Sequence, residues 1–471
     1  MAVFTYEQLQ GKYGYFDNPE VMIKVGNNEL TGKKGFPVSD VVVDLTSGYE
    51  ASVAEFSIYD TYNLAQNEFM FDAVKKFILI GSKVEISMGY KKKTTLVFVG
   101  VITRVNFLFE TEGVPCVRVT AMDVKGVMMA GSYARQLKAT NYSDAVSEIF
   151  KKTAYNKLKN SGVIKKIVVQ ATADKQQVSA SASAGAVPGK KQTTDKTIEM
   201  VAESDYEFVV KAGKRNNYEF YTDCGNVIFR KAKANNKILM EIAPTMGLRG
   251  FDISYDITGI VDKVIVRGMD VSKAKSIKSE KKLSNKLSQG NNAKQVISGS
   301  QKVYLDSTVS SKEDADARAA SLAEKISYRY GSMTCEMIGI PILKPGYFIK
   351  LYGLGTGADN KFYLTKVRHV YDTDGRYLVT LEGVSDSAGG TEMDSLDDLG
   401  SLAGLGDMGG LDAIGDFSDM DSVGNLAGGF DDLGDLGDMA GDLGDLAGDL
   451  GGLADAAGSV GDAIGGIGSL F

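Results

Sequence analysis

The sequence predicts an α+β protein, mainly β, followed by a tail rich in Gly, Asp and Leu. Short β-branched and aromatic segments, in which apolar and polar residues alternate, fill residues 1–125 and recur in residues 246–385. Helical patterns separate these two regions, in residues 126–245. The last segment, residues 386–471, contains 19 acidic residues and no Lys or Arg. At 471 residues the chain is too long for one core, and two to four domains are expected.

The first β-rich region, residues 1–125, has the pattern of a small barrel or sandwich. Turns rich in Gly, Asn or Lys separate its predicted strands. The strands are Val21–Val25, Val38–Asp44, Ala54–Tyr59, Lys83–Met88, Thr95–Asn106 and Cys116–Ala121. Residues 63–77 interrupt this pattern and predict a helical connection packed on the sheet.

Residues 126–245 predict a mixed α/β insert. Asn141 is a cap-type residue that precedes an amphipathic helix, and a second helix is expected after Thr194. Residues 171–192 lie between them and are rich in Ala, Ser, Gly and Lys, which is typical of a flexible surface loop. A hairpin is expected over residues 218–230.

Residues 246–385 return to strands. Residues 251–255 and 260–268 show the clearest strand patterns, and the Lys/Ser/Asn/Gln-rich residues 272–300 predict an exposed loop. Ser311 caps a predicted helix, residues 312–329, whose Ala and Leu residues share one side. Further strands are expected at Met333–Ile338, Tyr347–Tyr352, Phe362–Tyr371 and Tyr377–Glu382.

Charge is segregated along the chain. The 53 basic and 60 acidic residues give a net charge of −7, but the body, residues 1–385, carries 53 − 41 = +12. A basic body with an acidic tail indicates either a tail with its own partner or a solubilising surface.

The tail has a regular apolar pattern. From Leu396 to Leu426 an apolar residue recurs at every third position, eleven times in succession. After Phe430 the spacing alternates mainly between three and four, as in the seam of a coiled coil. We predict that this seam mediates oligomerisation, although a disordered Gly/Asp tail is the alternative. The seam residues are Leu433, Leu436, Met439, Leu443, Leu446, Leu450, Leu453, Val460, Ile464 and Ile467.

The sequence predicts no catalytic, cofactor-binding or metal site. The only histidine, His369, lies in an alternating strand pattern and is interpreted as a hydrogen-bonded core residue. The three cysteines are more than 100 residues apart, so neither a zinc site nor a disulfide scaffold is expected. No run of 18 apolar residues and no signal-peptide pattern occurs, so we expect a protein that is neither membrane-spanning nor secreted by a signal peptide.

Other motifs have ordinary structural interpretations. The carboxylate pairs Asp314/Asp316 and Glu110/Glu112 lie in charged surface contexts. The run Gly353-Leu-Gly-Thr-Gly lacks the Lys-Ser/Thr of a phosphate loop and predicts a hairpin turn, as does Lys91-Lys-Lys.

A different class of function, a cell-wall or carbohydrate-binding module, stays open at this point. The insert contains three aromatic residues that are expected to be exposed and could stack on a ligand, namely Tyr218, Phe220 and Tyr221.

The order of several motifs resembles the phage late control gene D family, the baseplate hub proteins that are similar to the hub half of VgrG spike proteins. The motifs are GSKVEISMGY from Gly81, LVFVGVITRVNF from Leu96, SDAVSEIF from Ser143, ESDYEFVV from Glu203, the Asp223–Phe229 hairpin, FDISYDITGIVDKVIVRG from Phe251, LKPGYFIKLYG from Leu343 and FYLTKVRH from Phe362. Together they cover about 380 residues in the family's order.

The resemblance implies a structural, non-enzymatic hub of a contractile phage tail, a tailocin or an injection system. Two similar tube-type β-barrels in each subunit of a homotrimer would form a six-barrel ring that adapts a hexameric inner tube to a trimeric spike. Implied partners are the inner tail tube protein above, the spike protein below, baseplate wedge proteins and, in the lumen, a tape-measure protein or cargo. No specific nucleic-acid recognition is expected. The implied location is the baseplate of a virion or virion-like particle, after synthesis in the bacterial cytoplasm. No spike segment follows Val384, and the tails would bundle on the trimer axis.

Overall fold

The computed structural model describes residues 4–32, 35–110, 113–172, 198–270, 274–287, 292–306, 309 and 311–389. The predicted oligomerisation seam, Leu433 to Ile467, and most of the predicted loop 171–192 therefore lie outside the described residues. Within the described part, no helix is both long and apolar enough to cross a membrane.

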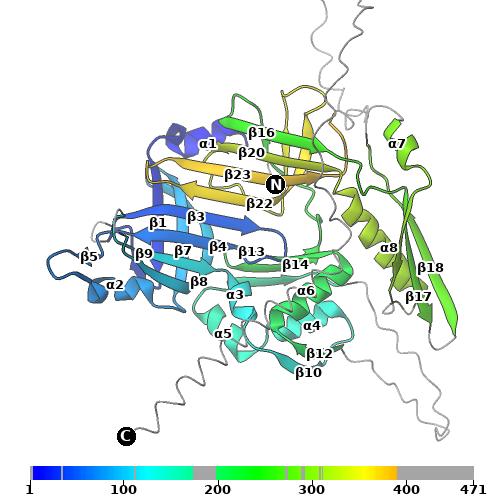
Figure 1. Ribbon diagram of the computed structural model, residues 1–471, viewed down its shortest axis with the longest axis horizontal. Helices are drawn as coiled ribbons and strands as arrows, with labels where there is room; N and C mark the ends of the chain where they lie inside the picture. The colour runs from blue at the N-terminus through cyan, green and yellow to red at the C-terminus, as the bar shows by residue number, and fades with distance from the viewer. Residues whose placement is uncertain are drawn as a thin grey trace, which may run out of the picture. The chain divides into compact units, whose positions relative to one another are not determined.

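A thirteen-stranded, mainly antiparallel sheet dominates the fold (Figure 1). Its order is β16 (Leu248–Tyr255), β20 (Gly331–Ile338), β23 (Tyr377–Ser385), β22 (Asn360–Tyr371), β3 (Val38–Thr46), β4 (Val53–Ile58), β9 (Cys116–Met122), β8 (Lys93–Leu108), β7 (Lys83–Tyr90), β1 (Pro19–Val25) and β2 (Asn28–Glu29). Off this path, β15 (Ile238–Ile242) pairs with β21 (Phe348–Leu351), which pairs with β22.

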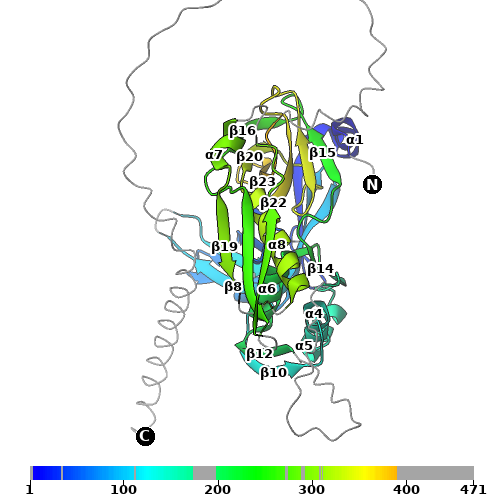
Figure 2. The same ribbon diagram turned by 90° about the vertical axis from the view of Figure 1, so that its right-hand side faces the viewer.

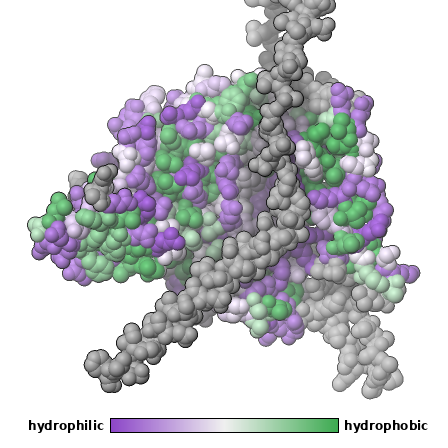
Figure 3. Space-filling view, viewed as in Figure 1, coloured by the Kyte–Doolittle hydropathy of each residue, from purple (hydrophilic) through white to green (hydrophobic). Residues whose placement is uncertain are grey.

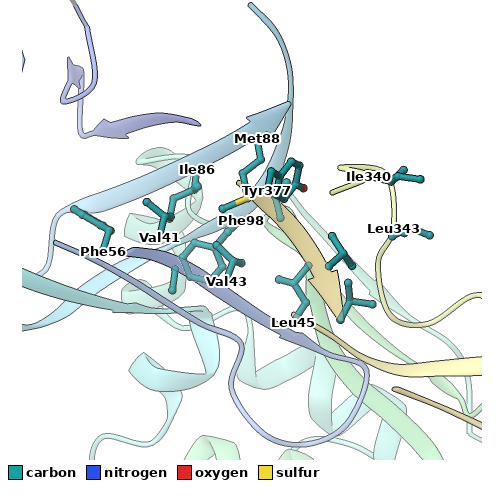
Figure 4. Packing of buried hydrophobic residues seen from close by; sticks show 14 of the residues in the cluster. Val41, Val43, Leu45, Phe56, Ile86, Met88, Phe98, Ile340, Leu343 and Tyr377 are labelled. Atoms are coloured by element: carbon teal, nitrogen blue, oxygen red, sulfur yellow. The ribbon is translucent and has the colours of Figure 1, made fainter. Parts of the chain in front are cut away.

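The sheet joins the two β-rich regions of the sequence. Strand β22 pairs antiparallel with β3, from Lys366 opposite Thr46 to Tyr371 opposite Val41. Residues near position 45 and residues near position 367 therefore contribute to one hydrophobic core. Figure 4 shows Val41, Val43 and Phe56 converging with side chains from the distant segments of that core.

Alternation explains why these strands form. Along β23 every second residue, from Tyr377 through Val379 to Leu381, is buried, while the residues between them are partly exposed. A strand points successive side chains to opposite faces, so this pattern buries one face only. The apolar face of the sheet is the core, and the other face is available to solvent or to partners.

The insert forms a second hydrophobic cluster. Its elements are α3 (Val124–Met128), β10 (Tyr133–Leu137), α4 (Tyr142–Ile149), α5 (Thr153–Asn160), β11 (Lys166–Val169), β12 (Ile198–Glu203), α6 (Asp205–Asn216), β13 (Tyr218–Asp223) and β14 (Asn226–Lys231). The predicted helix after Asn141 and the predicted hairpin are confirmed as α4 and the β13–β14 pair.

The prediction of a helix starting soon after Thr194 was wrong in part. Residues 198–203 form strand β12, which pairs with β10, and helix α6 begins only after Ser204. Ser204 and Glu207 form a reciprocal capping box there, and this local signal fixes the start of the helix.

A third cluster packs helix α8 on a three-stranded sheet. The sheet contains β17 (Lys263–Asp270), β18 (Lys275–Lys282) and β19 (Gln301–Leu305), and α7 (Asn292–Ile297) lies nearby in the chain. Helix α8 (Lys312–Ser327) starts where predicted, because the Ser311 hydroxyl accepts a hydrogen bond from the Asp314 backbone N–H. The prediction of a loop over residues 272–300 was wrong, since this segment contains β18 and α7.

Residues 63–77 also differ from the prediction. They contain the short hairpin β5 (Tyr62–Asn63) and β6 (Glu68–Phe69), and only then helix α2 (Phe71–Ile78). At the N-terminus, α1 (Tyr6–Lys12) and a 3₁₀ turn, Gly14–Phe16, precede β1. The fold class, mainly β with helices, is confirmed, and the domain limits near residues 125, 245 and 385 stay predictions.

Candidate assembly surface

The face of the central sheet that points away from the core is wide and polar. One row of residues crosses four neighbouring strands, each residue directly opposite the next. The row runs from Glu336 on β20 through Thr380 on β23 and Arg368 on β22 to Asp44 on β3. Directly opposite residues share a face, so these side chains form a continuous polar surface. Part of this face is visible in Figure 3 over the same strands.

Charges on this face are balanced. From β16 to β8 its acidic residues are Asp44, Glu55, Asp252, Glu336 and Glu382, and its basic residues are Arg104, Arg118, Arg249, Lys366 and Arg368. Arg368 Nε lies 3.6 Å from an Asp44 carboxylate oxygen, while partial burial raises the pKa of that carboxyl against the effect of Arg368 and Lys366. A polar face without net charge offers no strong attraction to either an apolar or a highly charged chain.

Strand β16 is a free edge of the sheet. Its one pairing among the described strands is with β20. Phe251 lies opposite Cys335, which is 1% exposed, so Phe251 is on the core side of the sheet. It is nevertheless 48% exposed, because no described strand covers the core beyond β16. An exposed edge with an uncovered core aromatic is a site where another chain can pair.

The opposite edge is partly closed. Strand β1 is capped by β2, and the Ile23 backbone N–H donates to the Thr31 hydroxyl at 3.0 Å. Pro19 at the start of β1 has no N–H to offer. The two ends of the sheet therefore differ, as a head-to-tail assembly requires.

A buried polar network holds the insert against the sheet. Glu219 of β13 accepts from the Tyr363 hydroxyl of β22 and from the Lys233 backbone N–H. Arg230 Nη2 lies 3.4 Å from Glu219 Oε2 and donates to the Gly346 carbonyl oxygen at 2.8 Å. Burial raises the pKa of the Glu219 carboxyl, although Arg230 and the Tyr363 hydroxyl oppose that rise. Because each group is satisfied, the network has a structural role.

A second buried charged group, the Lys125 amine, hydrogen-bonds to the turn between β3 and β4. Lys125 Nζ donates to the Gly48 carbonyl oxygen at 3.0 Å and to the Glu50 carbonyl oxygen. Burial lowers the pKa of Lys125 to about 8, against the effect of Asp123 and Glu50. Backbone carbonyl oxygens of Gly48, Tyr49 and Glu50 all accept from this amine, and it is interpreted as a structural cation.

His369 is a hydrogen-bonded core histidine, as predicted. Its Nδ1 lies 2.8 Å from the Tyr377 hydroxyl and its Nε2 lies 3.0 Å from the Leu343 carbonyl oxygen. A carbonyl only accepts, so Nε2 donates and Nδ1 accepts from Tyr377. Complete burial lowers the pKa of His369 to about 4. Both nitrogens are used, and neither is available for catalysis.

The expectation of exposed aromatics in the insert was wrong. Tyr218, Phe220 and Tyr221 are all buried, because Tyr218 and Phe220 pack in the insert core while the other face of β13 lies against Tyr363 and Gly346. The Tyr218 hydroxyl donates to the Ala171 carbonyl oxygen at 2.6 Å. These three residues cannot form a stacking platform for a carbohydrate.

The remaining motifs are surface turns and structural pairs. Lys91 and Lys92 both have positive φ and form the two-residue turn between β7 and β8. The run from Gly353 to Gly357 connects β21 with β22, so a strand and not a helix comes directly after it. Asp316 bonds with Lys312 and Ser279, while Asp314 lies in the first turn of α8. Glu110 is exposed, and its predicted partner Glu112 lies outside the described residues.

Within the described ranges no group of three or more Cys, His, Asp or Glu side chains could hold a metal ion. All three cysteines are unbridged thiols.

The sequence alone did not identify the free edge. It predicted the strand at residues 251–255, but which strand ends a sheet depends on contacts between distant segments. The one available signal is the alternation in residues 251–255, which places Phe251 on the apolar face.

Comparisons with known proteins give a family and a fold. The family model described as the Alg8 N-terminal domain matches residues 17–372. No curated protein sequence matches this chain significantly. Among solved structures, the chain is similar to the 43 kDa tail protein of prophage MuSo2 from Shewanella oneidensis, with 13% identity and a TM-score of 0.54 over 78% of this chain and 98% of that chain. It is similar to the tail protein from Neisseria meningitidis MC58, again with 13% identity and a TM-score of 0.54, over 78% of this chain and 97% of that chain. At this identity the likeness concerns the fold.

Proposed function

This chain belongs to the Alg8 N-terminal domain family, and we propose that it is a structural baseplate hub of a contractile phage tail, a tailocin or an injection system. In this role three copies form a ring that adapts the hexameric inner tube to the trimeric spike. Its fold is similar to that of two tail proteins, which supports a place in a tail. The hub performs no enzymatic step.

The main support is the central sheet. Its strands from two distant regions form one continuous wall, one face is polar and balanced in charge, and one edge is open. In a ring, the polar face lines the lumen and the open β16 edge meets the next copy. This arrangement satisfies the backbone groups of β16 and covers Phe251.

The proposed partners follow from the place of the hub in the tail. The inner tail tube stacks above the ring, the spike lies below it, and baseplate wedge proteins surround it. The lumen holds the end of a tape-measure protein or cargo. The protein is made in the bacterial cytoplasm and resides in the baseplate of the particle.

The first test is the effect of Phe251→Lys on self-association. The wild-type full-length chain is expected to have three times the monomer mass by light scattering across a concentration series. The substitution places a charge on the open edge and removes the burial of a half-exposed Phe, which contributes about 1.5 kcal/mol. At each contact of the ring we expect association to weaken at least tenfold.

Val201→Lys is the matched control, because Val201 is also an exposed strand residue but lies in the insert. It should leave the mass unchanged. A Phe251→Lys chain that still forms trimers at wild-type concentrations would exclude the β16 edge as a subunit contact.

The tail has a separate proposed role. Three tails bundle on the ring axis through the seam Leu433–Ile467 and place 3 × 19 = 57 acidic groups there. Residues 386–388 contact the body, so the test deletes only residues 390–471. Particles carrying the deletion are expected to show altered tube length or firing by electron microscopy. If particles with the deletion assemble, set tube length and fire normally, the proposed role of the tail is wrong.

A further inference from the structure

Aromatic side chains gather at the end of β8, where Phe107 and Phe109 are exposed and Tyr62 and Phe69 are half-buried. Tyr62 contacts Phe69 and Phe109, and Phe69 contacts Phe107, each with ring centroids 5.1 Å apart. Leu64 lies in the turn of the same β5–β6 hairpin, and Phe71 begins α2. We call these residues the aromatic end patch: Tyr62, Leu64, Phe69, Phe71, Phe107 and Phe109.

The aromatic end patch is unusually exposed for its composition. Leu64 is 78% exposed and Phe109 is 60% exposed. Figure 3 shows hydrophobic residues gathered at this end of the molecule, over α2 and β5. Along the chain the patch is flanked by exposed carboxylates of Asp60, Glu68, Asp72 and Glu110 and by exposed amines of Lys75 and Lys76, which together carry 2 − 4 = −2. A contiguous apolar surface with a polar rim marks an interaction site.

A second exposed apolar surface lies on the sheet β18–β17–β19. Helix α8 packs on one face of this sheet, where Val264 and Val266 are buried. The register places Ile265 beside Val303 and Arg267 beside Leu305 on the opposite face, where Ile265 itself is buried and Val303 and Leu305 are exposed. Figure 2 shows this sheet toward the viewer. We call the side opposite α8 the basic outer face.

The basic outer face combines apolar and basic residues. Leu305 is 83% exposed, and Val303 and Met269 are also exposed. Around them on the same face are Lys263, Arg267, Lys278, Lys282 and Glu280, which together carry 4 − 1 = +3. Lys263 and Lys278 both pair with Glu280. The face is thus basic and apolar where the aromatic end patch is acidic and apolar.

The two surfaces belong to opposite ends of the chain's fold. The aromatic end patch is formed by β8 and its neighbours, near the β1 end of the sheet order. The basic outer face belongs to the segment that follows β16, the strand at the other end. In Figure 1 β5 and α2 lie at the left, and β17 and β18 lie at the right. A single chain therefore cannot bring its own two surfaces together.

We propose that the aromatic end patch of one copy docks on the basic outer face of the next copy of this chain. The acidic rim of the patch and the basic residues of the outer face attract each other. Both surfaces also expose large apolar side chains, which the contact would bury. Two different surfaces on one chain make a head-to-tail contact, which closes into a ring for a suitable rotation. This inference rests on the proposed hub function and names the surfaces through which the copies meet.

The test uses two full-length variants and their mixture. Leu64→Lys places a positive charge against the basic outer face, and Leu305→Glu places a negative charge against the acidic rim. Each variant alone is expected to associate at least tenfold more weakly than the wild type in sedimentation experiments. An equimolar mixture recovers two-copy complexes with one copy of each variant, because the intact patch of the Leu305→Glu copy meets the intact face of the Leu64→Lys copy. The other contacts of a ring stay weakened.

Val201→Lys and Val296→Glu are the matched controls, since both side chains are 73% exposed and lie outside the two surfaces. They should associate like the wild type. The inference is overturned if the single variants associate like the wild type, if the mixture behaves like the separate variants, or if the wild type itself stays monomeric.

The outcome separates this inference from the hub proposal. If Leu64→Lys and Leu305→Glu stay trimeric while Phe251→Lys does not, the copies meet through the β16 edge, and only the head-to-tail contact is wrong. If the wild type is monomeric, both the contact and the proposed ring of free chains fail together, and a ring would need other tail components.

Discussion

Lowering the pH from 6.5 to 4 is expected to reduce the free energy of unfolding by about 3 kcal/mol through His369 alone. The folded-state pKa of about 4 lies below the ordinary value of 6.5. As the pH falls, the unfolded chain therefore binds a proton before the folded chain does, and unfolding becomes more favourable. The loss begins near pH 6.5 and levels off below the folded-state pKa.

The physical reason lies in the hydrogen bonds of the ring. In the neutral form Nε2 donates to the Leu343 carbonyl and Nδ1 accepts from the Tyr377 hydroxyl. Protonation adds a donor at Nδ1, which faces the hydroxyl hydrogen of Tyr377, and it places a charge in a site without access to water.

Chemical denaturation of the wild type and of His369→Gln, at several pH values, measures this contribution. Carboxyl groups also titrate in this pH range, but the wild type and the His369→Gln variant contain the same ones. The wild type should lose about 3 kcal/mol more than the variant between pH 6.5 and 4. Parallel pH profiles would mean that His369 is protonated equally in the folded and unfolded chains.

Gly346→Ala is expected to destabilise the fold by about 3 kcal/mol. Gly346 has φ +86°, where any side chain is strained, and a Cβ would lie 2.4 Å from the Tyr221 hydroxyl oxygen. The Gly346 carbonyl also accepts from Arg230, so a shift of this turn disturbs the link between the insert and the sheet. Both effects favour glycine at this position.

Gly355→Ala separates the two effects. Gly355 also has positive φ, +103°, but an added Cβ would have no atom within 4 Å. Thermal unfolding should therefore show a loss of about 1 kcal/mol for Gly355→Ala, from backbone strain alone. Equal losses for the two substitutions would contradict the clash with Tyr221. The double substitution Tyr221→Phe/Gly346→Ala should recover part of the loss.

Much of the secondary structure could be predicted from local signals. Helix α8 follows from the Ser311 cap and the Ala-rich side, and β22 and β23 follow from strict alternation. These elements bury one face only, so a periodic pattern describes them completely. Where a segment is polar on most positions, as β18 is, the pattern disappears, and pairing with β17 forms the strand.

The candidate surfaces could not be predicted from the sequence in the same way. Tyr221 and Phe251 are both aromatic residues in strands, yet Tyr221 is buried beneath Gly346 and Phe251 stands at an open edge. The difference arises from which segment lies next in space. Exposed Leu64 and Leu305 likewise have no local signature, because a turn or strand tolerates either a polar or an apolar residue there.

The pairing of β22 with β3 also affects how the chain folds during synthesis. Lys366 is opposite Thr46, so 366 − 46 = 320 residues must leave the ribosome between the two strands. At about 5–20 residues per second this takes roughly 15 to 65 seconds. Throughout that time the Val- and Leu-rich strand Val38–Thr46 lacks its neighbour on that side, in a crowded cell. The nascent chain is thus exposed to misassembly with other nascent copies, and chaperone capture of its first third would protect the yield of the finished protein.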